Sequence, residues 1–309
     1  MGSCEVDRPL GVMRDADLDR TLGSQGFVRL PGTQLSVAER RTLRQFFLDE
    51  FTGERSGFHN DFFLPDPKFR MRATQLMAGT THHLAEEWFV DHRPFLYTYL
   101  TKFASENSSL LEHRDWMYVN EPSGERSYIL YVAVDPADEV NGMLHLVPRS
   151  HLLDGPPCGT RLTWPWLAHS DMLRAHAVPV PLRPGEAVVW DNRLIHMSFE
   201  NASSVDRLAM GLWCHRRGGE LAHFVAHDKR SVSRFLVDEW FFMSATPPQL
   251  GEHDPDYPAA ERFRILDGDC SAETLDHVLR GDGWPASARA WSYESLPELL
   301  RAAEPEALM

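Results

Sequence analysis

Residues 113–227 form a succession of short apolar runs with turn signals between them, and this pattern limits the fold more than any other feature of the sequence. Gly, Pro and Asn mark the turns, as in the Asn141-Gly142 dipeptide. Several short strands in succession predict an antiparallel sandwich or barrel. The expected strands lie within 127–134, 142–147, 187–196 and 207–215.

Helices are expected on both sides of this β region. Ser36 and Glu39 form a capping-box pattern, and the apolar spacing after them predicts an amphipathic helix. Further helices are expected over about 84–103, with an interruption at Pro94, and over 271–280 and 295–303. Because no linker or repeat divides the chain, we predict one domain over 1–309. Its expected parts are an N-terminal arm with helices (1–105), a β core (106–228) and a C-terminal helical segment (229–309).

The charge balance excludes several classes of partner. The 309 residues include 31 Lys and Arg against 45 Asp and Glu, which gives a net charge of −14. Nucleic acids and anionic membranes require a basic surface, so neither is an expected partner. The longest run without charged residues covers 13 positions, 73–85, which is too short to cross a bilayer. The N-terminus has no apolar signal region, and the four Cys are widely spaced, so we expect reduced thiols in a cytoplasmic protein.

Three His-x-Asp triplets are candidates for a metal site. With 15 His and 23 Asp among 309 residues, about one triplet is expected by chance, so the motif alone carries little weight. The context separates the three: only His113-Arg-Asp115 leads directly into the strand series. The pair at His169 and Asp171 is typical of a helix start, and the pair at His59 and Asp61 lies in an aromatic loop.

On a strand, positions i and i+2 point to the same side, so His113 and Asp115 can bind one ion. A third imidazole would complete a two-His, one-carboxylate set that leaves coordination positions open and suits Fe(II) oxygen chemistry. His196 is the candidate, in the run Trp190-Asp-Asn-Arg-Leu-Ile-His196-Met-Ser198.

The segment after His196 predicts a hairpin with its loop at 201–204. In that register Ser198 faces Arg207 and His196 faces Ala209, with all four side chains on one surface. A metal ligand and a guanidinium on the same surface suit an anionic co-substrate, to which Ser198 would add a hydrogen bond.

These motifs together resemble the phytanoyl-CoA dioxygenase-like family of Fe(II)/2-oxoglutarate oxygenases. The resemblance rests on the His113-x-Asp115 pair, the segment from Asn141 to His151, and Pro184-Gly-Glu followed by His196-x-Ser198 with Arg207 eleven residues after that histidine. One departure is Arg149, where the family commonly has Gly. The resemblance implies a double-stranded β-helix (jelly-roll) core with flanking α-helices, which agrees with the strand pattern.

The resemblance also implies roles for particular residues. His113, Asp115 and His196 would bind iron, Arg207 and Ser198 would hold 2-oxoglutarate, and Tyr131 would lie beside it. The cofactors would be Fe(II), 2-oxoglutarate and O2. His145 and His151 are interpreted as structural.

The implied activity is hydroxylation of a small metabolite of specialised biosynthesis, by a monomer or homodimer. Desaturation, epoxidation or cyclisation would use the same iron site, whereas a halogenase is not expected, because related halogenases have Ala or Gly where this chain has Asp115. Two other hypotheses stay open: a jelly-roll binding protein without turnover, and a hydrolytic zinc site at His223, His227 and Asp228.

Overall fold

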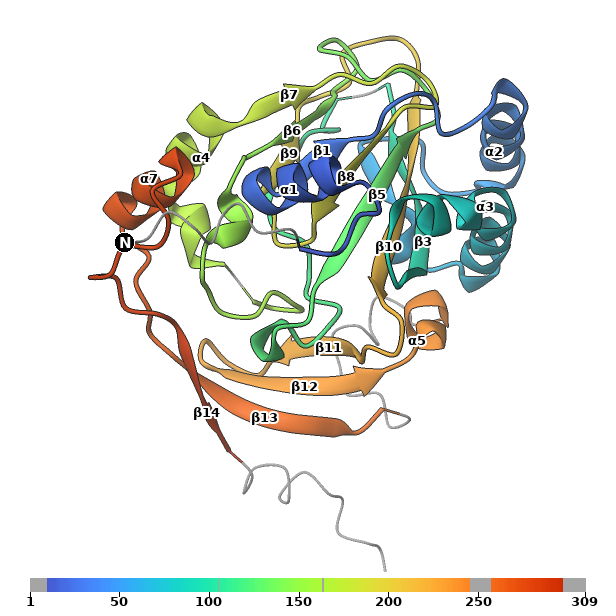
Figure 1. Cartoon of the computed structure of the whole chain (residues 1–309). Helices are drawn as coiled ribbons and strands as arrows, with labels where there is room; N and C mark the ends of the chain where they lie inside the picture. Colours follow the sequence, from blue (N-terminus) through green and yellow to red (C-terminus); the bar gives the residue numbers. More distant parts are fainter. Residues whose placement is uncertain (1–9, 105, 163, 245–256, 297–309) are drawn as a thin grey trace, which may run out of the picture.

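The computed structural model describes residues 10–104, 106–162, 164–244 and 257–296, and three antiparallel sheets organise them (Figure 1). The major sheet has the order β1-β8-β5-β10-β3-β2, the minor sheet β4-β9-β6-β7, and the third sheet β11-β12-β13-β14. Residues of β5 and β8 share a buried cluster with Leu144 and Leu146 of β6, so the major and minor sheets pack face to face. This confirms the expected jelly roll with flanking helices.

The elements of each sheet have the following bounds. The major sheet consists of β1 (Phe27–Arg29), β8 (Ala187–Asp191), β5 (Ser127–Ala133), β10 (Arg207–Arg216), β3 (His92–Lys102) and β2 (Phe58–Asn60). The minor sheet consists of β4 (Leu110–His113), β9 (His196–Ser198), β6 (Leu144–Leu146) and β7 (Val178–Val180). The third sheet consists of β11 (Leu221–Ala226), β12 (Ser231–Val237), β13 (Ala259–Leu266) and β14 (Ser292–Ser295).

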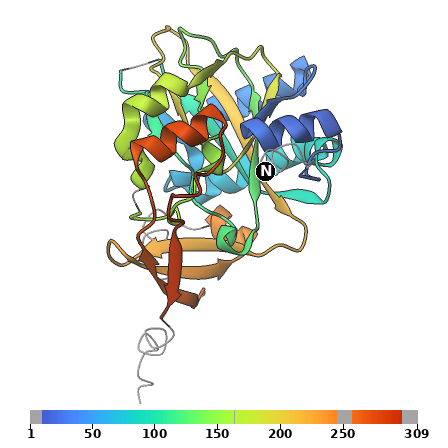
Figure 2. The ribbon, with the colours of Figure 1, turned by 60° about the vertical axis from the view of Figure 1, so that its left-hand side comes forward.

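Helices cover the outer faces of the two facing sheets. On the major sheet lie α2 (Val37–Glu50) and α3 (Pro67–Trp88), with α1 (Ala16–Gln25) near β1 (Figure 1). The predicted capping box at Ser36 and Glu39 is present and starts α2, which buries Leu43 and Phe47. On the minor sheet, α4 (Ser170–His176) and α7 (Ala272–Arg280) lie side by side (Figure 2), and both contribute to a buried cluster with Ile195 and Met197. A short helix, α5 (Glu239–Ser244), follows β12.

The helix expected over 84–103 is wrong for most of its length. Helix α3 ends at Trp88, Asp91 takes a positive φ of 53°, and β3 begins at His92. Most of β3 is buried on both faces, and the largely apolar run at 95–100 within it does not distinguish a strand from a buried helix. Pro94 lies at a register shift between β3 and β10, where its missing N–H removes no regular ladder bond.

The C-terminal part is also less helical than expected. Helix α7 confirms the prediction over 271–280, but β12, β13 and β14 make most of the described remainder strand. Alternating runs such as Ser231–Val237 carry this β signal. The helix expected over 295–303 lies almost entirely outside the described residues. That the whole chain is one domain stays a prediction.

Arg149, which stands where the related family commonly has Gly, has a left-handed backbone with a φ of 66°. This conformation explains the glycine preference, since a side chain there costs about 1–2 kcal/mol. Its guanidinium donates to the carbonyl of Leu279 at 3.2 Å, so Arg149 ties the turn after β6 to the end of α7.

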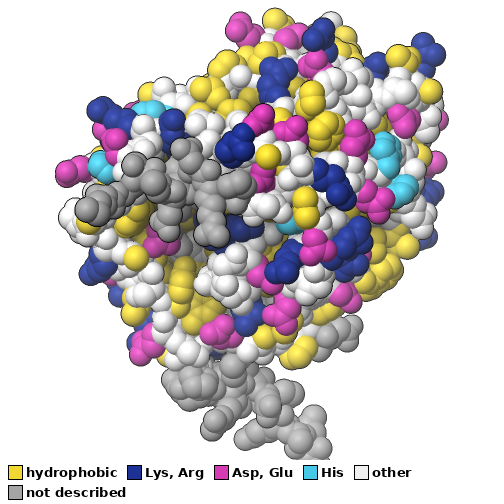
Figure 3. Space-filling model, in the orientation of Figure 1, with side chains coloured by type: hydrophobic (Ala, Val, Ile, Leu, Met, Phe, Trp, Pro, Cys, Tyr) yellow, Lys and Arg dark blue, Asp and Glu magenta, His cyan; other side chains and the backbone are white. Residues whose placement is uncertain are grey.

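Acidic and basic side chains are interspersed over the face seen in Figure 3, so the net charge of −14 is not one continuous patch there. Within the described residues, no helix combines the length and the apolar character needed to span a bilayer.

Candidate metal and co-substrate site

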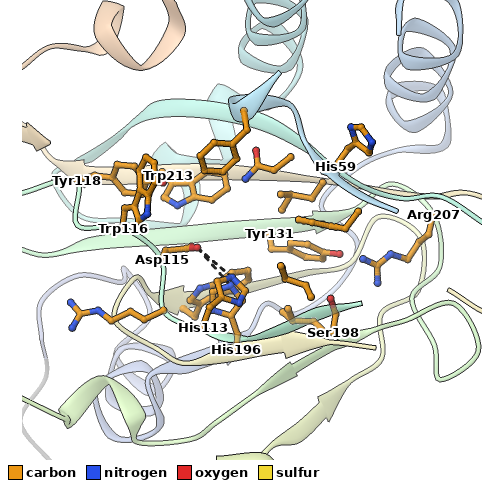
Figure 4. Close-up of a pocket in the computed structure, with 18 of the residues that line it drawn as sticks. His59, His113, Asp115, Trp116, Tyr118, Tyr131, His196, Ser198, Arg207 and Trp213 are labelled. Carbon is orange, nitrogen blue, oxygen red and sulfur yellow. Dashed lines mark ion pairs between the residues drawn. The ribbon is translucent and has the colours of Figure 1, made fainter. Parts of the chain in front are cut away.

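A cavity of about 540 Å³ lies between the major and minor sheets and contains all six candidate site residues. Figure 4 shows His113, Asp115 and His196 pointing toward one another. Arg207 lies on one side of them, and Trp116, Tyr118 and Trp213 lie on the other. The cavity therefore has a basic end and an aromatic end, with the candidate metal ligands between them.

The three candidate ligands come from two neighbouring strands. His113 ends β4, Asp115 follows two residues later, and His196 begins β9 directly opposite His113 in the ladder. The Nε2 atoms of His113 and His196 lie 3.7 Å and 3.9 Å from Oδ1 of Asp115. Their ligand atoms all lie within 4.8 Å of one another, a spacing that a single ion can bridge.

Hydrogen bonds orient both imidazoles for metal binding. Nδ1 of His113 donates to the carbonyl of Leu111 at 2.7 Å, and Nδ1 of His196 donates to that of Leu194 at 3.0 Å. This tautomer leaves both Nε2 atoms as acceptors beside the carboxylate.

Burial and the neighbouring His196 lower the pKa of His113 to about 3, and burial raises the pKa of Asp115. The carboxylate of Asp115 and the Nε2 atoms of the two imidazoles face one another, and a bound divalent cation would supply the positive charge that these ligand atoms share. The residues present therefore fit a resident metal ion.

The other metal hypotheses receive no support from the described residues, in which the His113, Asp115 and His196 group is the one cluster of this kind. His169 contacts the carbonyl of Cys270, and His227 contacts the hydroxyl of Ser233. His151 is buried against the carbonyl of Gly23, as expected of a structural histidine.

The predicted hairpin between β9 and β10 is wrong. Strand β9 pairs with β4 and β6 in the minor sheet, whereas β10 pairs with β3 and β5 in the major sheet. The segment 199–206 thus carries the chain from one sheet to the other. Ser198 and Arg207 still line the same cavity, because the two sheets face each other (Figure 4).

The basic end of the cavity offers unused hydrogen-bond donors. Arg207 is only 4% exposed, and its Nη1 donates to the carbonyl of Gly142. Among the described residues, neither Nε of Arg207 nor the hydroxyl of Tyr131 has a hydrogen-bond partner. Burial raises the pKa of Tyr131, so its hydroxyl stays protonated and can donate. Since buried polar groups are rarely left unpaired, these atoms fit an oxygen-rich anionic ligand such as 2-oxoglutarate.

The model of the phytanoyl-CoA dioxygenase (PhyH) family matches residues 21–209, more than half of the chain. The chain belongs to this family. Membership and the His-Asp-His group confirm the predicted cofactors, iron(II) and 2-oxoglutarate with O2. No curated protein sequence matches the chain.

Solved structures similar to this phytanoyl-CoA dioxygenase family member include the epimerase SnoN in complex with Fe3+, alpha ketoglutarate and nogalamycin RO. SnoN is 20% identical with a TM-score of 0.51, over 77% of this chain and 91% of SnoN, and supports the fold. EvdO2 from Micromonospora carbonacea var. aurantiaca, complexed with 2-oxoglutarate, is 20% identical over 68% of this chain and 94% of its own, with a TM-score of 0.48. HygX from Streptomyces hygroscopicus, with nickel and 2-oxoglutarate, is 15% identical over 65% and 87%, with a TM-score of 0.48.

Lys102 is a residue of this family member's site that the sequence did not reveal. It ends β3, directly opposite Arg207, and its side chain is fully buried. Its Nζ donates to the carbonyl of Ser108 and, at 2.6 Å, to the carbonyl of Phe199. The second hydrogen bond holds the start of the segment 199–206, the crossover that connects the two sheets and precedes Arg207. Burial and the adjacent Arg207 lower the pKa of Lys102 to about 7. Lys102 is one of three Lys in the chain, but nothing in its local pattern marks it as buried.

Gly142 provides a stability test of this crossover. Its φ is +74°, and a Cβ there would lie 2.3 Å from the carbonyl oxygen of Phe199. We expect Gly142→Ala to lower the free energy of unfolding by about 2–5 kcal/mol, from left-handed strain and overpacking together. Gly218 is the matched control: its φ is +77°, but nothing lies within 4 Å of its added Cβ. Gly218→Ala should cost about 1–2 kcal/mol, and equal losses in urea unfolding would contradict the close contact.

Proposed function

We propose that this protein is an Fe(II)/2-oxoglutarate-dependent dioxygenase that hydroxylates an unactivated C–H bond of a small metabolite in specialised biosynthesis. One observation carries the proposal: a His-Asp-His group and a buried Arg207 with an unpaired Nε line one cavity. The reaction would convert the substrate, 2-oxoglutarate and O2 to the alcohol, succinate and CO2, with one oxygen atom entering succinate and the other the product.

The side chains have separate roles in this proposal. His113, Asp115 and His196 hold iron on one side and leave its other positions open. Arg207, with Ser198 and Tyr131, pairs with the distal carboxylate of 2-oxoglutarate and so orients its keto-acid end toward the metal. Bound iron, 2-oxoglutarate and O2 would supply the oxidising chemistry.

The presence of Asp115 in the ligand set supports oxygenation rather than chlorination, because its carboxylate occupies the position that chloride takes in related halogenases. SnoN, an epimerase, is a structural neighbour with another named outcome. Hydroxylation is therefore the part of the proposal that needs product analysis. Gain of one oxygen atom, located by NMR as a hydroxyl on a saturated carbon, supports hydroxylation, whereas the same mass gain at a former double bond indicates epoxidation. Loss of two hydrogen atoms supports desaturation or oxidative cyclisation, and an unchanged mass supports epimerisation.

The proposed function predicts a visible charge-transfer band when Fe(II) and 2-oxoglutarate are added to the protein without oxygen. Succinate in place of 2-oxoglutarate should give no band, because it lacks the keto group that chelates the metal. Admission of air should then produce succinate and CO2 in equal amounts, even slowly and without substrate. Iron-loaded protein that shows neither the band nor succinate formation would refute the proposal and favour a binding protein without turnover.

A further inference from the structure

We propose that the substrate is an uncharged, largely apolar molecule with an oxygen acceptor, and that the amide of Asn60 donates a hydrogen bond to that oxygen. This inference rests on the proposed function, since it assigns the end of the cavity opposite Arg207 to the substrate. It names a chemical class and a specificity-determining residue.

The first observation is the aromatic wall of that end. Trp116 and Trp213 line it (Figure 4). Phe63 also lines the cavity, and 44% of its surface is exposed. Phe63 and Trp116 pack edge to face, with ring centroids 5.3 Å apart. An exposed apolar side chain on the border of an aromatic cavity favours entry of an apolar molecule.

The second observation concerns charge. Among the described residues that line the cavity, Asp115 is the one carboxylate, and it belongs to the metal group. An ammonium group would therefore enter an apolar cavity without a free counter-charge, which is costly. Two buried cations also line the cavity: Arg207 lies at the other end, where 2-oxoglutarate is proposed to bind, and Arg114 is already paired with the carboxylate of Glu121. An uncharged substrate follows from this distribution.

The third observation fixes the orientation of the Asn60 amide. Asn60 ends β2, and its Oδ1 accepts hydrogen bonds from Oγ1 of Thr98 at 2.7 Å and from the backbone N of Phe62 at 3.0 Å. The backbone N–H of Phe62 can only donate, so its partner on Asn60 must be the amide oxygen, and this settles which end of the amide is which. Nδ2 has no acceptor among the described residues, and Asn60 lines the cavity. The NH2 group is therefore the unused donor at this position.

The register separates Asn60 from the co-substrate end. Across the neighbouring strands β2, β3 and β10, Phe58 lies opposite Lys102, and Lys102 lies opposite Arg207. Asn60 lies two residues further along β2, opposite Leu100, and Leu100 lies opposite Ala209. Asn60 also lies on the edge strand of the sheet, two strands from β10. It can contact a substrate without contacting the group that Arg207 binds.

Two indane probes test the proposal by equilibrium dialysis against protein that holds iron and 2-oxoglutarate under argon. 1-Indanone has an oxygen acceptor and indane has none, so the ratio of their dissociation constants isolates the hydrogen bond from general apolar affinity. We expect Asn60→Leu and Asn60→Asp each to raise the indanone-to-indane ratio about fivefold, the usual value of one neutral hydrogen bond. Asn60→Asp retains both accepted hydrogen bonds and so preserves the local turn. The cationic probe 1-aminoindane should bind more weakly than indanone.

The control is Asn107→Asp, the same change at an exposed position outside the cavity, which should leave the ratio unchanged. The charge-transfer band, titrated in the same samples, reports 2-oxoglutarate affinity, which should not change in the Asn60 variants. An unaltered ratio, a loss of 2-oxoglutarate affinity, no indanone binding to the unmodified protein, or tightest binding of the amine would each overturn the inference. Absence of the band in unmodified protein would instead contradict the proposed function, so the two failures are distinguishable.

Discussion

Substitution of His196 by Ala is expected to abolish stable iron binding and, with it, turnover. His196 is 5% exposed, and its imidazole is held by the carbonyl of Leu194 with Nε2 toward Asp115. Loss of a partner that only orients a ligand already weakens metal binding about 10- to 100-fold, so loss of the ligand itself should cost at least about 100-fold. Anaerobic Fe(II) titration and the charge-transfer band with 2-oxoglutarate measure the effect.

His145 offers a matched control for this substitution. It lies on β6, the strand next to β9, and its ring packs on Phe199 rather than on the metal group. His145→Ala should retain iron and the band. Unaltered iron affinity in the His196 variant would show that the metal group is wrongly assigned, even if the variant were inactive for another reason.

The sequence predicted that His113, Asp115 and His196 lie together, and for the first two residues the reason is local. His113 and Asp115 are two residues apart at a strand end, and this spacing alone places both side chains on one side. The third ligand, His196, was chosen from the run Trp190–Ser198 and from its expected surface shared with Arg207, since no local spacing rule joins it to a residue some eighty positions earlier. In the folded chain, His196 lies next to His113 because the two residues are directly opposite each other in the antiparallel pair of β4 and β9.

The same reasoning explains the wrong hairpin. Neighbouring strands in sequence usually pair, and the turn at 201–204 favoured such a pairing. In the jelly roll this segment is a crossover between sheets, and the buried Lys102, whose Nζ donates to the carbonyl of Phe199, fixes it. A contact of this kind between distant segments leaves no periodic trace in the sequence. The convergence of Ser198 and Arg207 was predicted correctly, but for a reason that the pairing of β9 and β10 contradicts.

The role proposed for Asn60 could not be predicted from the sequence, again because it depends on a contact between distant segments. Its amide is oriented by Thr98, which is 38 positions away, so the free donor exists only in the folded chain. The His59 and Asp61 pair around it was dismissed as a metal site, and Asp61 indeed lies outside the metal group. The segment 59–61 therefore contributes no metal ligand, but its Asn60 lines the same cavity.

The second large effect is expected from Arg207→Ala, which should raise the concentration of 2-oxoglutarate needed for half-saturation about 100-fold or more. Truncation of one partner of a buried, hydrogen-bonded charge pair costs about 2–5 kcal/mol, and Arg207 is 4% exposed with Nε unpaired. Iron binding without 2-oxoglutarate should be unchanged, because the metal group does not include Arg207. This separates loss of the co-substrate contact from a general loss of the site.

Two further variants sharpen the result. Arg207→Lys keeps the charge but loses the fork of donors, so its 2-oxoglutarate requirement should lie between those of Arg207→Ala and the unmodified protein. Arg183, with 88% of its side chain exposed, is the control, and Arg183→Ala should leave the requirement unchanged. Added guanidinium ions should partly restore 2-oxoglutarate binding to Arg207→Ala, since they can occupy the space of the missing group, whereas a merely unfolded variant would not respond. A 2-oxoglutarate requirement equal to that of the unmodified protein would exclude Arg207 as the carboxylate partner and leave the cavity's basic end without a ligand.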